Sequence, residues 1–485
     1  MAAAGAVLAN KLVRNCREFL TNAKHTGVQS GLLLLLILVA LSRLLFAIVI
    51  WKVNGPSGFY LSDSFGYVYL AQSLLHGSFL RADAQPDIFR TPGYPLSLLP
   101  AAISGHFVFA AILENILFAV ASAWLIWKIT SDLLPGTKAA YWAVMLYCFE
   151  PMGWLYSARI LSDTLFCAQF LLFVWLLLRF LRSPEYTRLL LAALALGCAT
   201  YTRPIALYMG LWLVPILLWF PRALPWRQRM ARAILFPSIT ILMVAPWILR
   251  NEAVAGFPTF SSAGSYSLYF YAGTSVRTKL EHRTLEQIQQ AEGSTTDQHY
   301  FQLHPEQGAW TQGQIVRYLD VEGRRKIVEH PLLYTQIHLN GCAIVLFEPG
   351  VTEILKALRL YPEEGGLLTR TFDQGFMRAM LWLFQHYPIA AVAFPLMAFQ
   401  LLVYYAFAAA GFTKLPTEIR CLFAAIILYF VLISGFPGSV ARYRVPIMPL
   451  LCISAGIAIV SRSKKALAET EAAEVDLVAA PVRSQ

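Results

Sequence analysis

The stretch GLLLLLILVALSRLLFAIVIW, residues 31–51, decides the fold class of this chain. Its only charged residue is Arg43. A helix needs about 20 apolar residues to cross the hydrocarbon core of a bilayer, and this stretch has that length. It is too long for the apolar core of a signal peptide, and no small-residue cleavage site follows it. We therefore predict an uncleaved first membrane span.

The composition of the whole chain agrees with this start. The 485 residues are 57% hydrophobic and 14% charged, whereas soluble domains carry about 25% charged residues. This excludes a soluble cytosolic enzyme, a disordered protein and a fibrous repeat. The net charge of +11 is attributed to cytoplasmic loops that face anionic lipid. Nucleic acid is not an expected partner, because no basic stretch is interleaved with aromatic residues. The seven cysteines are scattered, without the spacing of a zinc site or a disulfide framework.

Further apolar segments predict an all-α polytopic membrane protein of about ten transmembrane helices. After 31–51 they cover roughly 106–127, 139–157, 161–178, 189–202, 205–220, 233–248, 386–410, 419–435 and 445–460. Lys and Arg concentrate in one set of connections, which places both termini in the cytoplasm. The predicted divisions are a cytoplasmic segment 1–30, a membrane domain 31–248 that includes a first outer loop 52–105, an extracytoplasmic domain 249–385, three last spans 386–462 and a cytoplasmic tail 463–485.

The extracytoplasmic domain is predicted to be small and mixed. Residues 259–272 are rich in Ser, Tyr and Phe, which favours strands. Residues 280–345 have a helical pattern, and the apolar residues 331–347 are expected to lie along the interface.

Two charges fall inside predicted spans, Arg43 in the first and Glu114 in the second. A lone charge at such depth costs several kcal/mol, so partners are expected. The rise of about 1.5 Å per residue places both at a similar depth. We predict that they are neighbours, either as a structural ion pair or as a polar floor beneath a site.

Other charges cluster at the predicted outer face. The set consists of Asp63, Arg90, Asp163, Arg203, Arg250, Arg442 and Arg444. Each arginine alone is explained by interfacial snorkelling. Several arginines in these loops are unexpected, because short outer loops usually contain few Arg residues. Since Arg binds phosphate through planar, bidentate donors, the set predicts an outward-facing site for a membrane-embedded phosphate or pyrophosphate.

The sequence lacks the signatures of soluble nucleotide substrates. It has no Walker pattern, no Gly-x-Gly-x-x-Gly after a strand and no Asp-x-Asp pair. A polyprenyl-phosphate sugar combines an activated bond, an anionic leaving group and a membrane anchor. Arginines would stabilise the departing phosphate, and a carboxylate would take the proton of an acceptor hydroxyl.

Several motifs resemble those of the GT-C membrane glycosyltransferases. They are the Asp63-Ser-Phe-Gly-Tyr67 segment that continues to Gly77, Phe-Arg90-Thr-Pro92-Gly93-Tyr94-Pro95, Tyr201-Thr-Arg203-Pro204, Pro246-Trp-Ile-Leu-Arg250-Asn251 followed by Gly256, the run ending at Pro331, and Ala441-Arg442-Tyr-Arg444-Val-Pro446. In order and spacing they are similar to the protein O-mannosyltransferase and lipid A aminoarabinose transferase group, the glycosyltransferase family 39-like group. The resemblance spreads over most of residues 30–460.

This resemblance implies roles for individual residues. Asp63 matches the catalytic carboxylate of the first outer loop. Many relatives have an Asp-Glu pair there, whereas this chain has Ser64 in place of the Glu, which puts a pair-dependent metal role in doubt. Arg90 stands where the aminoarabinose transferase carries a phosphate-facing Lys. Asp163 matches an acidic position at the start of the fourth span, where it would orient an arginine or the sugar, or take part in catalysis.

The sequence thus predicts an inverting glycosyltransferase that moves a hexose or pentose from a polyprenyl-phosphate donor to a lipid, glycan or protein acceptor. Asp63 would be the general base, and Arg90, Arg203, Arg250, Arg442 and Arg444 would bind the donor phosphate. Tyr67, Tyr94 and Asp163 would support them, although both tyrosines also suit simple interface aromatics. The expected location is a bacterial inner membrane, with the site on the periplasmic face. No metal ligand is assigned, but a divalent metal is left open.

Three other classes fit parts of the pattern. A transporter or flippase of lipid-linked sugars would also have many spans and buried charges, but it would place its polar residues near the bilayer midplane. A non-catalytic membrane assembly or sensor protein gives no reason for the Asp63 and Arg90 motifs. A lipid-linked polysaccharide ligase or polymerase shares related architecture.

Overall fold

The computed structural model describes residues 31–294, 296–362, 367, 370 and 375–462. The predicted cytoplasmic segments 1–30 and 463–485 lie outside these residues. The described part is helical throughout and contains no strand, only one isolated antiparallel bridge between Leu80 and Pro86. The prediction of an all-α membrane fold is confirmed.

Six helices of the described part are long and apolar enough to cross a membrane. They are the first helix Gly31–Phe59, which ends in the 3-10 segment η1 (Gly55–Phe59), together with α5 (Phe107–Leu133), α8 (Asp163–Arg182), α12 (Trp226–Ala255), α22 (Pro388–Phe412) and α23 (Thr417–Ser434). Four apolar segments are shorter: α6 (Ala139–Cys148), the broken segment Pro204–Trp219 (η2, Pro204–Ala206; α10, Met209–Trp212; α11, Val214–Trp219), α18 (Pro331–Phe347) and the last helix, Met448–Arg462. The predicted span 189–202 is α9 (Tyr186–Thr202).

The predicted span 139–157 is broken as well. Residues 139–157 form two helices, α6 and α7 (Pro151–Ser157), because the chain leaves the helical path at Glu150. The Glu150 carboxylate accepts hydrogen bonds from the backbone N–H groups of Met152 (3.2 Å) and Gly153 (2.5 Å). A side chain that accepts from the first N–H groups of a helix stabilises its start, so Glu150 defines where α7 begins.

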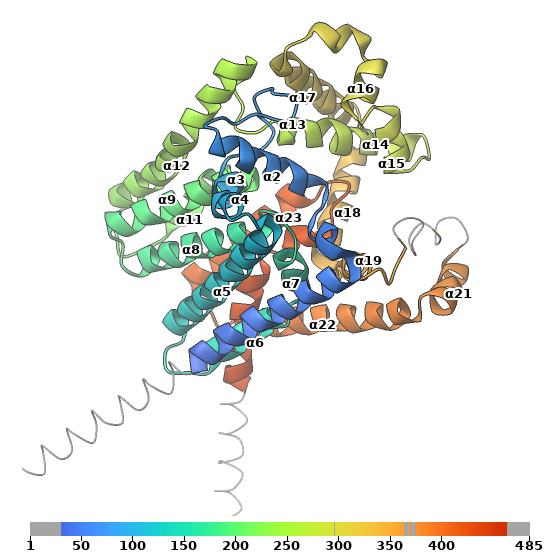
Figure 1. Ribbon diagram of the computed structural model, residues 1–485. Helices are drawn as coiled ribbons and strands as arrows, with labels where there is room; N and C mark the ends of the chain where they lie inside the picture. The colour runs from blue at the N-terminus through green and yellow to red at the C-terminus, as the bar shows by residue number, and fades with distance from the viewer. Residues whose placement is uncertain (1–30, 295, 363–366, 368–369, 371–374, 463–485) are drawn as a thin grey trace, which may run out of the picture.

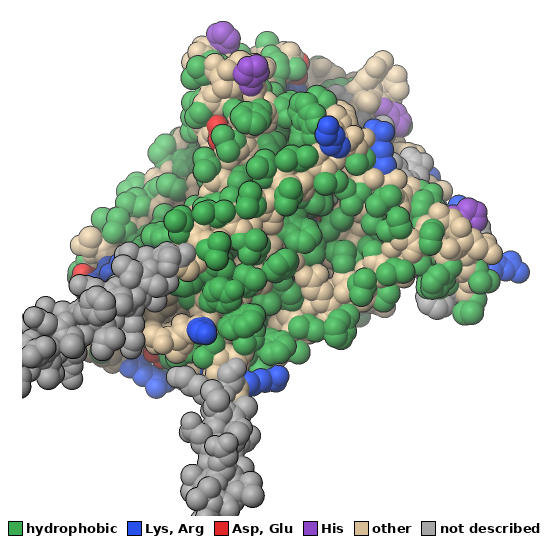
Figure 2. Space-filling view, turned by 60° about the horizontal axis from the view of Figure 1, so that its bottom comes forward, with side chains coloured by type: hydrophobic (Ala, Val, Ile, Leu, Met, Phe, Trp, Pro, Cys, Tyr) green, Lys and Arg blue, Asp and Glu red, His purple; other side chains and the backbone are tan. Residues whose placement is uncertain are grey.

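Helix α8 lies at the centre of the bundle. It packs against α5 on one side and α9 on the other, and Phe166, Phe170 and Phe173 are fully buried along it. Phe430 of α23 meets the Phe170 ring edge-on at 5.1 Å. The exterior is apolar as well: Figure 2 shows hydrophobic side chains over most of one face of the bundle. Such a surface suits lipid rather than water.

The helices of the first and second connections lie toward the top of the bundle in Figure 1, whereas α21 lies apart from them at the end of α22. The first connection contains α2 (Ser62–Leu75), α3 (Gly93–Ser97) and α4 (Leu99–Ile103), and the second contains α13 (Ala263–Ser267), η3 (Leu268–Gly273), α14 (Thr274–Leu280), α15 (Leu285–Ala291), α16 (Asp297–Leu303), η4 (Pro305–Ala309) and α17 (Gln312–Val328). After α18 come α19 (Val351–Ala357) and α21 (Phe376–His386).

The strands predicted in residues 259–272 are wrong. This segment contains α13 and the π-helical turn η3, which pack on α17. Tyr269 and Phe270 bury their rings there against Leu319. Aromatic β-propensity reflects a fit to a half-buried surface, and here a helix provides that surface.

The predicted pairing of Arg43 with Glu114 is also wrong. Among the described residues no ion pair joins them. The Arg43 side chain is fully buried and donates to the carbonyls of Tyr147 (3.0 Å), Cys148 (3.4 Å) and Glu150 (3.5 Å). These carbonyls are exposed by the break between α6 and α7. A helix end leaves its last carbonyls unsatisfied, and the charge of Arg43 compensates them.

Candidate functional site

Asp63 lies in the first turn of α2, where its side chain is 44% exposed. The turn is held by Ser64, whose Oγ accepts the backbone N–H of Leu61 at 2.9 Å. Two guanidiniums face the Asp63 carboxylate: Arg90 Nη2 lies 3.6 Å from Oδ1, and Arg442 Nη1 lies 3.8 Å from Oδ2. Both distances exceed those of a good hydrogen bond, so Asp63 is close to its arginines without being bound tightly by them.

Asp163 anchors Arg442 from the opposite side. Its carboxylate is fully buried at the start of α8. Arg442 Nε lies 3.1 Å from each carboxylate oxygen, and Nη2 lies 2.8 Å from Oδ2. Arg203 Nη1, at the end of α9, also donates to Oδ1. Two hydrogen-bonded guanidiniums make the buried charge of Asp163 tolerable.

Asp87 holds the backbone at Arg90 rather than its guanidinium. Its buried carboxylate lies 3.9 Å from Arg90 Nη1, and its Oδ1 accepts the backbone N–H groups of Phe89 (2.8 Å) and Arg90 (2.7 Å). Burial raises the pKa of Asp87, while these backbone donors and the Arg90 charge oppose the rise. Asp87 is therefore a structural partner of Arg90, and the sequence offered no signal that separated it from a solvated loop residue.

Tyr67 and Tyr94 form the wall on which Arg90 rests. Arg90 Cζ lies 5.4 Å from the Tyr67 ring centroid, and the two tyrosine rings meet edge-to-face at 5.0 Å. Tyr94 is fully buried.

A Cβ atom at Gly66 would lie less than 3 Å from the Arg90 guanidinium, so glycine is needed where this side chain crosses α2. A Cβ at Gly93 would meet the Tyr201 backbone just as closely, which lets α3 pack on the end of α9.

Two arginines that were predicted to bind the donor phosphate point away from Asp63. Arg250 donates to the carbonyls of Asp87 (2.6 Å) and Phe79 (3.2 Å), and so it ties α12 to the first connection. Arg444 is buried and donates to the carbonyls of Val345, Leu346 and Glu348 at the end of α18. In this structure both guanidiniums thus bind backbone carbonyls rather than facing Asp63.

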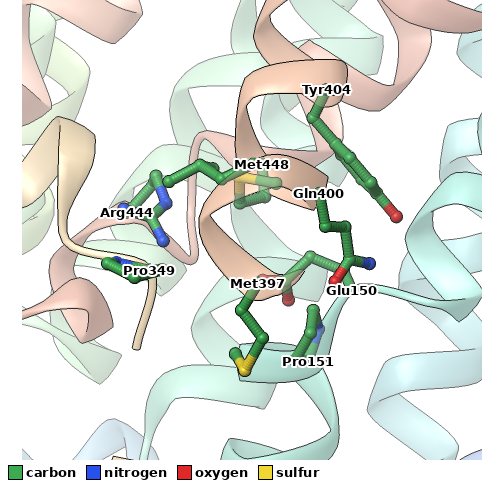
Figure 3. Close-up of a pocket in the computed structure, with 9 residues that line it drawn as sticks. Glu150, Pro151, Pro349, Met397, Gln400, Tyr404, Arg444 and Met448 are labelled. Carbon is green, nitrogen blue, oxygen red and sulfur yellow. The ribbon is translucent and has the colours of Figure 1, made fainter. Parts of the chain in front are cut away.

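The divergence of Arg442 and Arg444 has a simple cause. Both lie in the 3-10 helix η5 (Ala441–Arg444). With about three residues per turn, positions two apart point to different sides of such a helix. Arg444 consequently lines a separate small cavity of about 20 Å³, together with Glu150, Gln400 and Tyr404 (Figure 3). This volume holds about one water molecule.

A further carboxylate lies behind Arg442. Glu353 of α19 accepts a hydrogen bond from the Tyr156 hydroxyl of α7, and Arg442 Cζ lies 5.5 Å from the Tyr156 ring centroid. Burial raises the pKa of Glu353 to about 7. No motif in the sequence marks Glu353; the available signal is a pair of acids, Glu348 and Glu353, after the apolar segment 331–347.

Five charged residues of the predicted site thus converge at one end of the bundle: Asp63, Arg90, Asp163, Arg203 and Arg442. Arg442 has one edge held by the buried Asp163 carboxylate and another edge facing Asp63. The Arg90 guanidinium lies 3.9 Å from the Asp87 carboxylate and 3.6 Å from that of Asp63. In the described ranges no three His, Cys, Asp or Glu side chains are grouped so that they could hold a metal ion. The arrangement offers one partly exposed carboxylate and two guanidiniums to an anionic ligand.

Residues 96–249 match the model of the dolichyl-phosphate-mannose-protein mannosyltransferase family. The predicted resemblance to the protein mannosyltransferase group is confirmed. The matched segment runs from α3 into α12 and includes Asp163 and Arg203. Asp63, Arg90 and Arg442 lie outside it. The chain is an integral membrane protein.

Two solved structures of an oligosaccharyltransferase from Archaeoglobus fulgidus are also similar. One is AglB in complex with an inhibitory peptide and a dolichol-phosphate (11% identity, TM-score 0.43), and the other is an apo form (12% identity, TM-score 0.44). Each comparison covers 92% of this chain and 52% of the other chain, so this chain spans about half the length of those enzymes. No curated protein matches the sequence.

Proposed function

We propose that this protein is an inverting membrane glycosyltransferase that uses a polyprenyl-phosphate-linked sugar. The observation that carries the proposal is the position of Asp63 between the free edges of Arg90 and Arg442. The family match over residues 96–249 supports it.

The proposed reaction begins when the donor phosphate replaces Asp63 as the partner of the two arginines. Arg442 keeps its Nε and Nη2 contacts with Asp163, so that Nη1 is oriented toward the phosphate. Arg90 offers its Nη2 from the other side. Two positive groups held before the reaction stabilise charge that develops on the leaving phosphate without a reorganisation cost.

Asp63 then acts as general base. It takes the proton from the hydroxyl of a lipid, glycan or protein acceptor. The acceptor oxygen bonds to the anomeric carbon from the side opposite the phosphate, and the bond between that carbon and the phosphate oxygen breaks. The products are the glycosylated acceptor with inverted configuration and the polyprenyl phosphate. We place this reaction at the periplasmic face of a bacterial inner membrane, with both termini in the cytoplasm, because the basic connections favour that orientation.

The test is lipid extraction and mass spectrometry of membranes from cells with active protein, compared with an Asp63→Asn strain. The proposal expects a polyprenyl-phosphate sugar to accumulate in the variant while one glycan modification is lost. Asp83→Asn is the matched control, because Asp83 lies in the same connection and pairs with Arg81 on the surface. Unchanged lipids and glycans, with Asp63→Asn folded and the wild type active, would refute the proposal in favour of transport.

A further inference from the structure

Glu353 is a second acidic group at this end of the bundle, separate from the carboxylates that hold the arginines. It lies on α19, a short helix that packs against α7 and α22. Its Oε2 accepts a hydrogen bond from the Tyr156 hydroxyl, whereas its Oε1 is buried without a hydrogen-bond partner. A buried carboxylate oxygen without a partner is costly when the group is ionised, so the site favours a neutral Glu353.

Tyr156 connects this carboxyl to the candidate site. Its hydroxyl is bound to Glu353, and its ring lies against the Arg442 guanidinium, with 5.5 Å between the ring centroid and Cζ. Arg442 is bound to Asp163 and faces Asp63 through Nη1. The path from Glu353 to the proposed phosphate position therefore runs through one aromatic ring and one guanidinium.

The charged and titratable groups around Glu353 come from four neighbouring parts of the fold: Tyr156 of α7, Asp163 of α8, Glu348 before α19 and Arg442 of η5. Burial is the largest influence, and it raises the Glu353 pKa to about 7. The nearby Glu348 charge adds to the rise, while the Tyr156 hydrogen bond and Arg442 oppose it. The carboxyl therefore changes its protonation state near neutral pH.

We propose that Glu353, acting through Tyr156, is a positioning residue that regulates how tightly Arg442 holds the phosphate of a lipid-linked donor. This inference rests on the proposed function. A neutral Glu353 leaves the positive charge of Arg442 available to the phosphate. An ionised Glu353 places a negative charge behind Arg442, which weakens its attraction for an anionic ligand. Donor affinity should therefore fall as pH rises through neutrality.

The experiment measures binding of undecaprenyl phosphate, as the probe, to the full-length protein in lipid nanodiscs. Affinity is determined at about pH 6 and about pH 8 for the wild type, Glu353→Gln and Tyr156→Phe. The amide of the Glu353→Gln variant would still accept the Tyr156 hydrogen bond but could not ionise. The probe changes its own ionisation over this range, so the informative quantity is the ratio of wild-type to variant Kd at each pH. Glu306→Gln, which replaces an exposed acid on η4, is the matched control.

The ratio of wild-type to Glu353→Gln Kd should be close to one at the lower pH and about three to ten at the higher pH, the size expected for one charge acting across several ångströms. Tyr156→Phe keeps the ring beside Arg442 but removes the hydrogen bond that favours the ionised carboxyl, so its Kd at the higher pH should also lie below that of the wild type. If Glu353→Gln does not fold, the comparison of Tyr156→Phe with the wild type tests the inference. Glu306→Gln should match the wild type at both values.

Two results would overturn the inference in distinguishable ways. If Arg442→Gln weakens probe binding while the ratio for Glu353→Gln is the same at both pH values, Glu353 does not regulate the site and the proposed function stands. If Arg442→Gln and Arg90→Gln both fold and bind the probe like the wild type, the phosphate does not bind here. The proposed function then fails together with this inference.

Discussion

Asp163→Asn gives the sharpest test of the site's architecture. The substitution keeps the shape of the side chain and removes one buried charge. Asp163 has no exposed side-chain surface, and Arg203 and Arg442 are only 13% and 17% exposed. An amide in this place would present N–H donors to guanidinium N–H donors. Breaking a buried ion pair by removing one partner costs about 3–5 kcal/mol, so we expect the free energy of unfolding to fall by about that amount.

The matched control is Asp83→Asn. This is the same substitution in an Arg–Asp pair, but Arg81 and Asp83 are 35% and 48% exposed. Exposed pairs contribute about 0–1 kcal/mol. The assay is reversible unfolding of the purified protein in mixed micelles, titrated with a denaturing detergent. If Asp163→Asn destabilises the protein no more than Asp83→Asn, the buried cluster does not stabilise this end of the bundle and the reasoning is wrong.

Three other predictions concern Arg43 and the glycine beside Arg90. Gly66→Ala should reduce glycosyl transfer about as strongly as Arg90→Ala, because the added methyl group displaces the Arg90 guanidinium; a kinetic assay in which Gly66→Ala matches the wild type would contradict this. Arg43→Leu should destabilise the protein by about 1–3 kcal/mol, since it removes the buried guanidinium that donates to the carbonyls of Tyr147, Cys148 and Glu150. Exchanging the charges of Arg43 and Glu114 should not restore the yield of folded protein in membranes that either single substitution lowers. Recovery of that yield would support an Arg43–Glu114 pair instead.

The position of a residue along a predicted span indicates its depth in the membrane but not its neighbours, and Arg43 is an example. The cost of a lone charge in the membrane correctly indicated that Arg43 needs a buried partner, whereas counting residues along two helices favoured Glu114. It could not identify that partner, because the break at Glu150 exposes backbone carbonyls that are invisible in an apolar sequence. The same break turned one predicted span into two short helices.

The candidate site was predictable in part for a related reason. Asp63, Arg90, Asp163, Arg203 and Arg442 all lie near the ends of apolar segments, and the membrane brings segment ends to a common level. Their convergence therefore follows from the hydropathy pattern, although their catalytic roles stay predictions. Glu353 escaped notice because its importance depends on burial and on Tyr156, which lies nearly two hundred positions earlier in the chain.

By itself, the sequence determined that this chain is an all-helical membrane protein with a charged cluster at one end. Long apolar runs leave no other way to satisfy the backbone in lipid, and charges at their ends must collect at the same boundary. Only the tertiary structure decided which way each charge points. Arg442 reaches Asp63 and Asp163, whereas Arg444, two residues later, binds the end of α18. The physical reason is that the direction of a side chain depends on helix rotation and on the carbonyls left unsatisfied nearby, which are set by packing.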